Sequence, residues 1–91
     1  MSNEQRDVLN CSLDLQRAAK FYFLDPTGTT YKTFFDHATH TLSSVTGGKS
    51  KECMIFLRDI EARFGGVKNS VDREHLAEKI LSVSSLLKGI A

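Results

Sequence analysis

Four amphipathic helical patterns, separated by short turn-forming segments, constrain what this chain can fold into. In each pattern apolar residues recur every three or four positions, so they share one side of a helix that turns about 100° per residue. The patterns occupy residues 3–24, 30–46, 51–64 and 71–88. Four such helices can hide their apolar stripes only by packing together. The sequence therefore predicts an all-α fold, a four-helix up-down-up-down antiparallel bundle.

The composition agrees with this fold and limits the number of domains. A chain of 91 residues, of which 41% are apolar, supplies one hydrophobic core, so residues 1–91 are expected to form a single helical domain. One proline and six glycines leave few turn signals for a sandwich or a barrel of short strands.

The ends of the helices carry recognisable signals. Ser2 and Gln5 have the spacing of a capping box, in which each side chain binds the other residue's backbone N–H. The Gly47-Gly48 pair is expected to end the second helix, because the residue after a helix often needs left-handed geometry. Ser50 is then expected to cap the third helix.

The apolar stripes also predict which side chains are buried. On the first helix, Asn10, Asp14 and Arg17 are expected on the solvated face, opposite the stripe. Cys11 and Cys53 fall on apolar stripes, which is typical of reduced, buried thiols rather than of a disulfide. The predicted core comprises Phe34, Leu42, Phe56, Leu57, Ile60, Leu76, Ile80 and Val83.

The chain lacks the residue patterns that are typical of several functional classes. The His, Asp, Glu and Cys positions do not converge on one point, so we expect no metal and no cofactor. Gly48-Lys49-Ser50 matches the end of a phosphate-binding loop, but the first glycine of that motif is replaced by Ser43. No Gly-x-Ser-x-Gly elbow or exposed thiol is present, so the chain is not expected to be an enzyme.

The hydropathy and the net charge of the chain limit the classes of partner that we expect. No apolar run approaches the roughly 18–20 residues that span a bilayer, and the first residues lack the apolar region of a signal peptide. We therefore expect a cytoplasmic protein with no membrane partner. With 12 basic and 11 acidic residues, the net charge is +1, so nucleic-acid binding is not the leading expectation.

His40 is the histidine with the most specific local pattern. It lies almost opposite the stripe of its helix, so it should face water. The stretch Ala38-Thr39-His40-Thr41-Leu42 resembles the phospho-accepting segment of histidine phosphotransfer domains, which are four-helix bundles that present an exposed histidine to response regulators. The resemblance implies that His40 accepts a phosphoryl group. Ser43 and Ser44 stand where that family usually has a lysine and a glycine, and the alternative is a solvated surface histidine.

Apolar residues outside the stripe of the first helix are the remaining functional signal. Consecutive residues of the run Phe21-Tyr22-Phe23-Leu24 cannot all face one seam, so part of it must cap the end of the bundle or meet a partner. The leading prediction is a non-enzymatic, regulatory or adaptor module that binds another protein, with a homodimer as one form of that binding. Phosphotransfer through His40 is the alternative, and a small helical nucleic-acid-binding regulator is the third. The candidate interface comprises Leu9, Leu13, Phe21 and Phe23.

Overall fold

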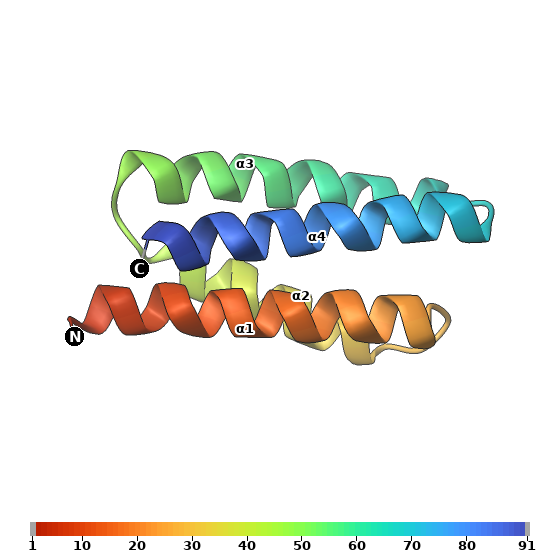
Figure 1. The fold of residues 1–91 in the computed structure, drawn as a ribbon, viewed down its shortest axis with the longest axis horizontal. Helices are drawn as coiled ribbons and strands as arrows, with labels where there is room; N and C mark the ends of the chain where they lie inside the picture. Colours follow the sequence, from red (N-terminus) through yellow and green to blue (C-terminus); the bar gives the residue numbers. More distant parts are fainter. Residues whose placement is uncertain (1, 91) are drawn as a thin grey trace.

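The structure, a computed structural model, describes residues 2–90 and is all-helical (Figure 1). The predicted all-α class is confirmed, and no strand occurs in the described part of the chain. A single turn of 3-10 helix, η1, follows the third helix. The elements are α1 (Asn3–Leu24), α2 (Thr30–Ser43), α3 (Gly48–Arg63), η1 (Phe64–Gly66) and α4 (Ser70–Ile90).

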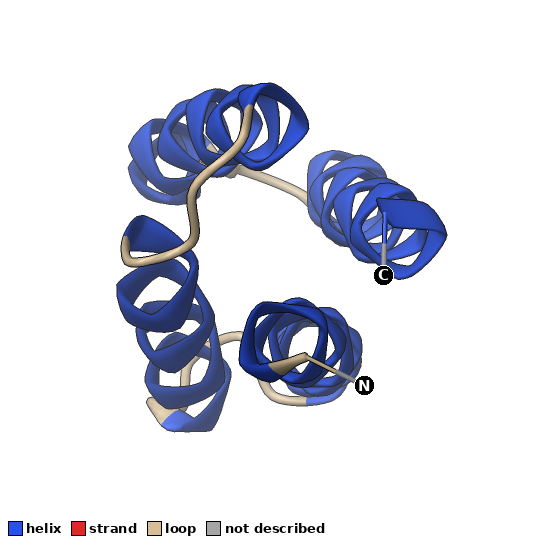
Figure 2. Ribbon diagram, turned by 90° about the vertical axis from the view of Figure 1, so that its left-hand side faces the viewer, coloured by secondary structure: helices blue, strands red, loops and turns tan. Residues whose placement is uncertain are grey.

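The helices lie along one long axis and surround a common core. The molecule measures 40 × 20 × 18 Å, and the start of α1 and the end of α4 lie at the same end of its long axis (Figure 1). Seen along that axis, α2 and α4 lie on either side of α1, and α3 lies across from it (Figure 2). α1 packs extensively against both α2 and α4, whereas α3 packs mainly against α4 and only lightly against α2. α1 therefore has two closely packed neighbours, whereas α3 has one.

The core is one cluster to which all four α-helices contribute. Six of the eight predicted core residues are buried: Leu42, Leu57, Ile60, Leu76, Ile80 and Val83. Phe34 is partly buried and packs against the cluster. Phe56 is 50% exposed, so its predicted burial is wrong. Since α3 has only one close neighbour, its buried stripe is narrow and leaves Phe56 at its edge.

The predicted polar face of α1 also needs a correction. Asp14 was expected in water, yet it is only 6% exposed. It lies three residues after Cys11 and four before Ala18, both fully buried, so it borders the core stripe. Because α1 is covered from two sides, its buried arc is wider than one stripe and includes the polar residues Ser12 and Asp14.

The helix ends confirm one predicted cap and overturn another. Ser2 and Gln5 form the expected capping box, with N–H to oxygen distances of 2.9 and 3.1 Å. α2 ends at Ser43, three residues earlier than the predicted residue 46, while α3 already begins at Gly48 instead of residue 51. Gly47, with φ of 122°, precedes α3, so it serves the start of that helix. Ser50 is a buried residue of the first turn of α3 and does not cap it.

Serine side chains explain the early end of α2. The Ser43 hydroxyl donates to the His40 carbonyl at 2.6 Å, and the Ser44 hydroxyl donates to the Thr41 carbonyl at 2.8 Å. Such local side-chain bonds to the backbone compete with continuation of a helix. The C-terminal end of α2 is therefore set by these hydroxyls before the chain reaches Gly47.

Candidate functional site

The four candidate interface residues do not share one environment. Leu13 is 46% exposed and Phe23 is 54% exposed, whereas Leu9 is partly buried. Phe21 is also partly buried, and its ring stacks on Phe34 with the centroids 5.7 Å apart and the planes within 9°. Phe21 therefore contributes to internal packing between α1 and α2, and Leu13 and Phe23 are the open apolar side chains of the set.

Phe23 lies in a surface groove between α1 and α4, which we call the α1–α4 groove. The groove has a volume of about 340 Å³. Its α1 side includes Phe23 and Leu24, and its α4 side includes Leu81, which is 45% exposed. Leu13 lies seven residues before Lys20, another lining residue, so the outer face of α1 continues the apolar surface along the helix. The charged lining residues are Lys20, Glu74 and Glu78.

A second apolar groove, between α3 and α4, contains the residue whose burial was wrongly predicted. This α3–α4 groove has a volume of about 360 Å³ and is lined by Phe56 and Leu86, which are 50% and 52% exposed. Because its spacing assigned Phe56 to the core, the sequence did not predict this groove.

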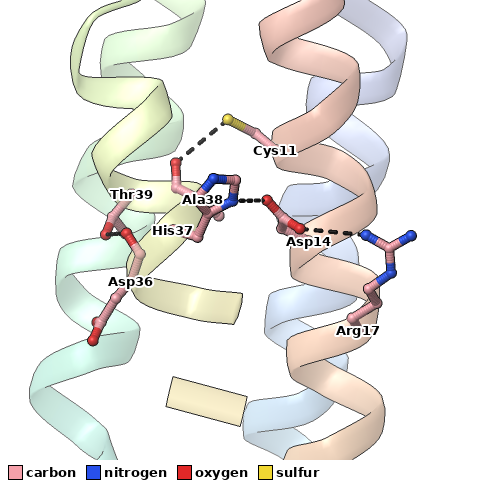
Figure 3. A network of polar contacts seen from close by, with 7 residues as sticks. All are labelled: Cys11, Asp14, Arg17, Asp36, His37, Ala38 and Thr39. Atoms are coloured by element: carbon pink, nitrogen blue, oxygen red, sulfur yellow. Dashed lines mark hydrogen bonds and ion pairs between the residues drawn. The ribbon is translucent and has the colours of Figure 1, made fainter. Parts of the chain in front are cut away.

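The most specific polar arrangement is a buried carboxylate between two exposed side chains, shown in Figure 3. The side chain of Asp14 is 8% exposed, and those of His37 and Arg17 are 64% and 54% exposed. Asp14 Oδ2 is hydrogen-bonded to His37 Nδ1, and Asp14 Oδ1 lies 3.4 Å from Arg17 Nη1. We call the first contact the Asp14–His37 pair. It joins α1 to α2.

Sequence reasoning missed this pair, because it placed Asp14 on the solvated face of its helix and did not single out His37. Asp14 and His37 are 23 positions apart and belong to different helices. The spacing of Asp14 from Cys11 and Ala18 was an available signal of its burial. No local pattern, however, indicates which residue of α2 lies opposite it.

The two cysteines are free and buried, as predicted. The Cys11 thiol donates to the Ala38 carbonyl at 3.4 Å. Burial, reinforced by the negative charges of Asp14 and Asp7, raises the pKa of Cys11 to about 12. Burial also raises the pKa of Cys53. Neither thiol is a ready nucleophile near neutral pH, because the thiolate is the reactive form.

His40 is exposed on α2, three residues after His37. Its imidazole makes no hydrogen bond or ion pair in the described structure, whereas its backbone carbonyl accepts from Ser43. The two histidines of α2 therefore differ in one respect that matters for reactivity: only His37 has a ring nitrogen held by a carboxylate.

Two further findings concern metals and membranes. Within residues 2–90, no three His, Cys, Asp or Glu side chains come together in a way that could hold a metal ion. None of the described helices has both the length and the apolar character that crossing a bilayer requires.

Comparison with protein-family models, with curated proteins and with solved structures found no match to this chain.

Proposed function

We propose that this protein is a non-enzymatic helical interaction module that binds another protein through the outer face of α1 and the α1–α4 groove. The up-down-up-down antiparallel bundle is the frame of the proposal, and the reversal of chain direction between successive helices in Figure 1 supports it. The observation that carries the proposal is the exposure of Phe23, Leu13 and Leu81 on neighbouring parts of one surface. Contiguous exposed apolar side chains with a polar rim are typical of binding surfaces.

A second copy of this chain is the partner we favour. The groove carries charges of both signs, Lys20 on α1 and Glu74 and Glu78 on α4. In a two-fold symmetric dimer the same patch of each copy meets the other, so a patch with both signs can complement itself. The apolar side chains would then lie at the centre of the interface and the charges at its rim.

Sedimentation of the full chain tests this proposal. Burying one Phe contributes about 1.5–3 kcal/mol, so Phe23→Glu is expected to raise the dissociation constant of the dimer at least tenfold. Ile55→Glu is the matched control, because Ile55 is 68% exposed on α3 and does not line the α1–α4 groove. A wild-type chain that stays monomeric at millimolar concentration, or equal weakening by both substitutions, would contradict the proposal.

Phosphotransfer through His40 is the second candidate function. The observation in its favour is the exposed imidazole on α2, which a phosphorylated partner can approach. The hydroxyl of Ser43, at the position of the usual lysine, supplies no cation for the phosphoryl group. Incubation with a phosphorylated response-regulator receiver tests it: uptake of phosphate that His40→Ala abolishes would support this function, and an unmodified wild-type chain would exclude it.

A further inference from the structure

Among the four α-helices, α3 is held most lightly by the rest of the molecule. It packs mainly against α4 and only lightly against α2. Its buried apolar side chains are Cys53, Leu57 and Ile60. α1, by comparison, buries Val8, Cys11, Leu15, Ala18, Ala19 and Tyr22. Since packing is stabilised mainly by apolar burial, separating α3 from the core costs less free energy than separating α1.

α3 also lacks polar contacts that would fix it against its neighbours. Within residues 2–90, no hydrogen bond or ion pair joins a side chain of α3 to another helix. Its ion pairs, Arg58 with Glu61 and Arg63 with Asp59, lie within the helix itself. α1, in contrast, has side chains bonded to both α2 and α4. Hydrogen bonds require a defined distance and direction, so they hold α1, α2 and α4 in register but not α3.

The chain on the N-terminal side of α3 is attached to α1. Thr46 donates its N–H and its hydroxyl to Glu4 Oε1 at 3.2 and 2.8 Å, and the neighbouring Val45 is buried. The Gly47-Gly48 pair then leads into α3, and the space where a Cβ atom would lie is open at both glycines. The attachment therefore ends at Thr46, just before the helix begins.

The chain on the C-terminal side of α3 is attached to α1 and α2 by an aromatic ring. Phe64, the first residue of η1, packs against three rings of these helices. Its centroid lies 5.1 Å from that of Tyr22, 5.3 Å from that of Tyr31 and 5.2 Å from that of Phe35. Thr46 and Phe64 thus form two fixed points on either side of α3.

From these contacts we infer that α3 leaves the core and unwinds as one unit between Thr46 and Phe64, while α1, α2 and α4 stay packed together. An isolated helix of 16 residues is only marginally stable in water, so α3 loses its helical structure once it leaves the core. The opening brings Cys53, Leu57 and Ile60 into water. It leaves the α1–α4 groove intact, so the inference does not rest on the proposed dimer.

Amide hydrogen exchange of the full chain tests the inference, in reducing buffer with urea below the unfolding transition. Partial opening depends less on urea than global unfolding does, because this dependence scales with the surface exposed. The slowest amides of α3 are expected to exchange at least about tenfold faster than those of α1 and α4, with a weaker urea dependence. Equal rates and equal urea dependence in the three helices would overturn the inference.

Two substitutions test which residues move in the opening. Leu57 is fully buried, so Leu57→Ala should speed the exchange of the α3 amides about tenfold or more. Phe64→Leu weakens contacts that persist when α3 opens. It should leave the α3 rates unchanged and speed the slowest amides of α1 and α2. Faster α3 exchange in Phe64→Leu, or unchanged α3 exchange in Leu57→Ala, would contradict the inference. Where a variant fails to fold, the urea dependence of the wild type decides.

The two buried thiols supply an independent measurement. Cys53 lies on α3, whereas the Cys11 thiol is bonded to Ala38 between α1 and α2, which stay together. Iodoacetamide should therefore alkylate Cys53 at least about tenfold faster than Cys11 in the native protein. Leu57→Ala should speed the alkylation of Cys53 by the same factor as the exchange of the α3 amides. Alkylation of Cys11 at the rate of Cys53, or a Cys53 rate that Leu57→Ala leaves unchanged, would count against the opening.

Discussion

Ser12 and Ser84 hydrogen-bond reciprocally across the contact between α1 and α4. The Ser12 hydroxyl donates to the Ser84 carbonyl at 2.9 Å, and the Ser84 hydroxyl donates to the Ser12 carbonyl at 2.8 Å. Both residues are almost fully buried, at 2% and 1% exposure. Small side chains let two helix backbones approach closely. Here each serine hydroxyl also hydrogen-bonds to the backbone carbonyl of the other serine. The close packing of α1 against α4 therefore requires small side chains at positions 12 and 84.

Enlarging one member of this pair should destabilise the protein. Ser84→Leu forces a large side chain between two closely packed helices, and we expect the free energy of unfolding to fall by about 1–3 kcal/mol. Ser85→Leu is the matched control, because Ser85 is exposed one position further along α4. It should change the free energy by less than about 0.5 kcal/mol. Urea unfolding measures both, and equal effects would show that the serine pair is not a close contact.

Truncations on α3 separate its true core residue from the wrongly assigned one. Ile60 is 2% exposed, so Ile60→Ala should lower the free energy of unfolding by about 2–5 kcal/mol. Phe56 is 50% exposed, and Phe56→Ala should lower it by about 1 kcal/mol or less, since half of the ring surface already faces water. Denaturant midpoints of the two variants check this order. A larger loss of stability for Phe56→Ala than for Ile60→Ala would indicate that Phe56 is buried, as its spacing predicted.

Periodicity predicts the helices well because it reports the side of each helix that avoids water. It does not report how much of that side the neighbouring helices cover. Phe56 lies beside Ile60 on a helical projection, yet α3 has one close neighbour and leaves it open. Asp14 lies beside Ala18, and α1 has two close neighbours that cover it. Both errors arise because coverage is decided by the packing of distant segments.

The candidate site was predictable only in part for the same reason. The exposure of Leu13 follows from its position on α1, far round from the buried stripe. Phe23 lies only four residues after the buried Ala19, so its spacing alone does not predict its exposure. The stacking of Phe21 on Phe34 depends on how α2 lies against α1. The Asp14–His37 pair likewise depends on the register of two helices. A single sequence contains no local signal for that register.

The buried thiol of Cys11 makes stability depend on alkaline pH. Its pKa is raised to about 12 by burial and by the nearby charges of Asp14 and Asp7, whereas an unfolded thiol titrates near about 8.5. Between these values the unfolded chain binds fewer protons than the folded chain, so stability falls as pH rises. Urea unfolding under reducing conditions at pH 7 and pH 10 measures the decrease.

Cys11→Ala is the control for that pH dependence. The variant should lose less stability than the wild type between the two pH values, because the unfolded chain no longer has this thiol to ionise. Cys53 and Tyr22, whose pKa values are also raised by burial, still contribute a decrease of the same sign. An identical decrease in variant and wild type would show that Cys11 titrates normally in the folded protein. A thiol reagent that modifies Cys11 rapidly in the native protein would show the same.

The two histidines of α2 should differ in their effect on stability. His37→Ala removes a partner from the buried Asp14 carboxylate, and leaving a buried acceptor unsatisfied costs about 1–3 kcal/mol. The contact with Arg17 persists, so we expect the lower part of that range. His40→Ala removes an exposed imidazole without a partner and should change the free energy of unfolding by less than about 0.5 kcal/mol.

A double-mutant cycle with Asp14→Ala tests whether the loss at His37 arises from the Asp14–His37 pair. Once the carboxylate is gone, His37→Ala has no buried acceptor to expose, so its cost should fall to that of His40→Ala. The cycle therefore yields a coupling energy of about 1 kcal/mol for His37 with Asp14 and close to zero for His40 with Asp14. Equal coupling for both histidines would mean that Asp14 supports α2 as a whole. In that case its carboxylate would not act through the ring of His37.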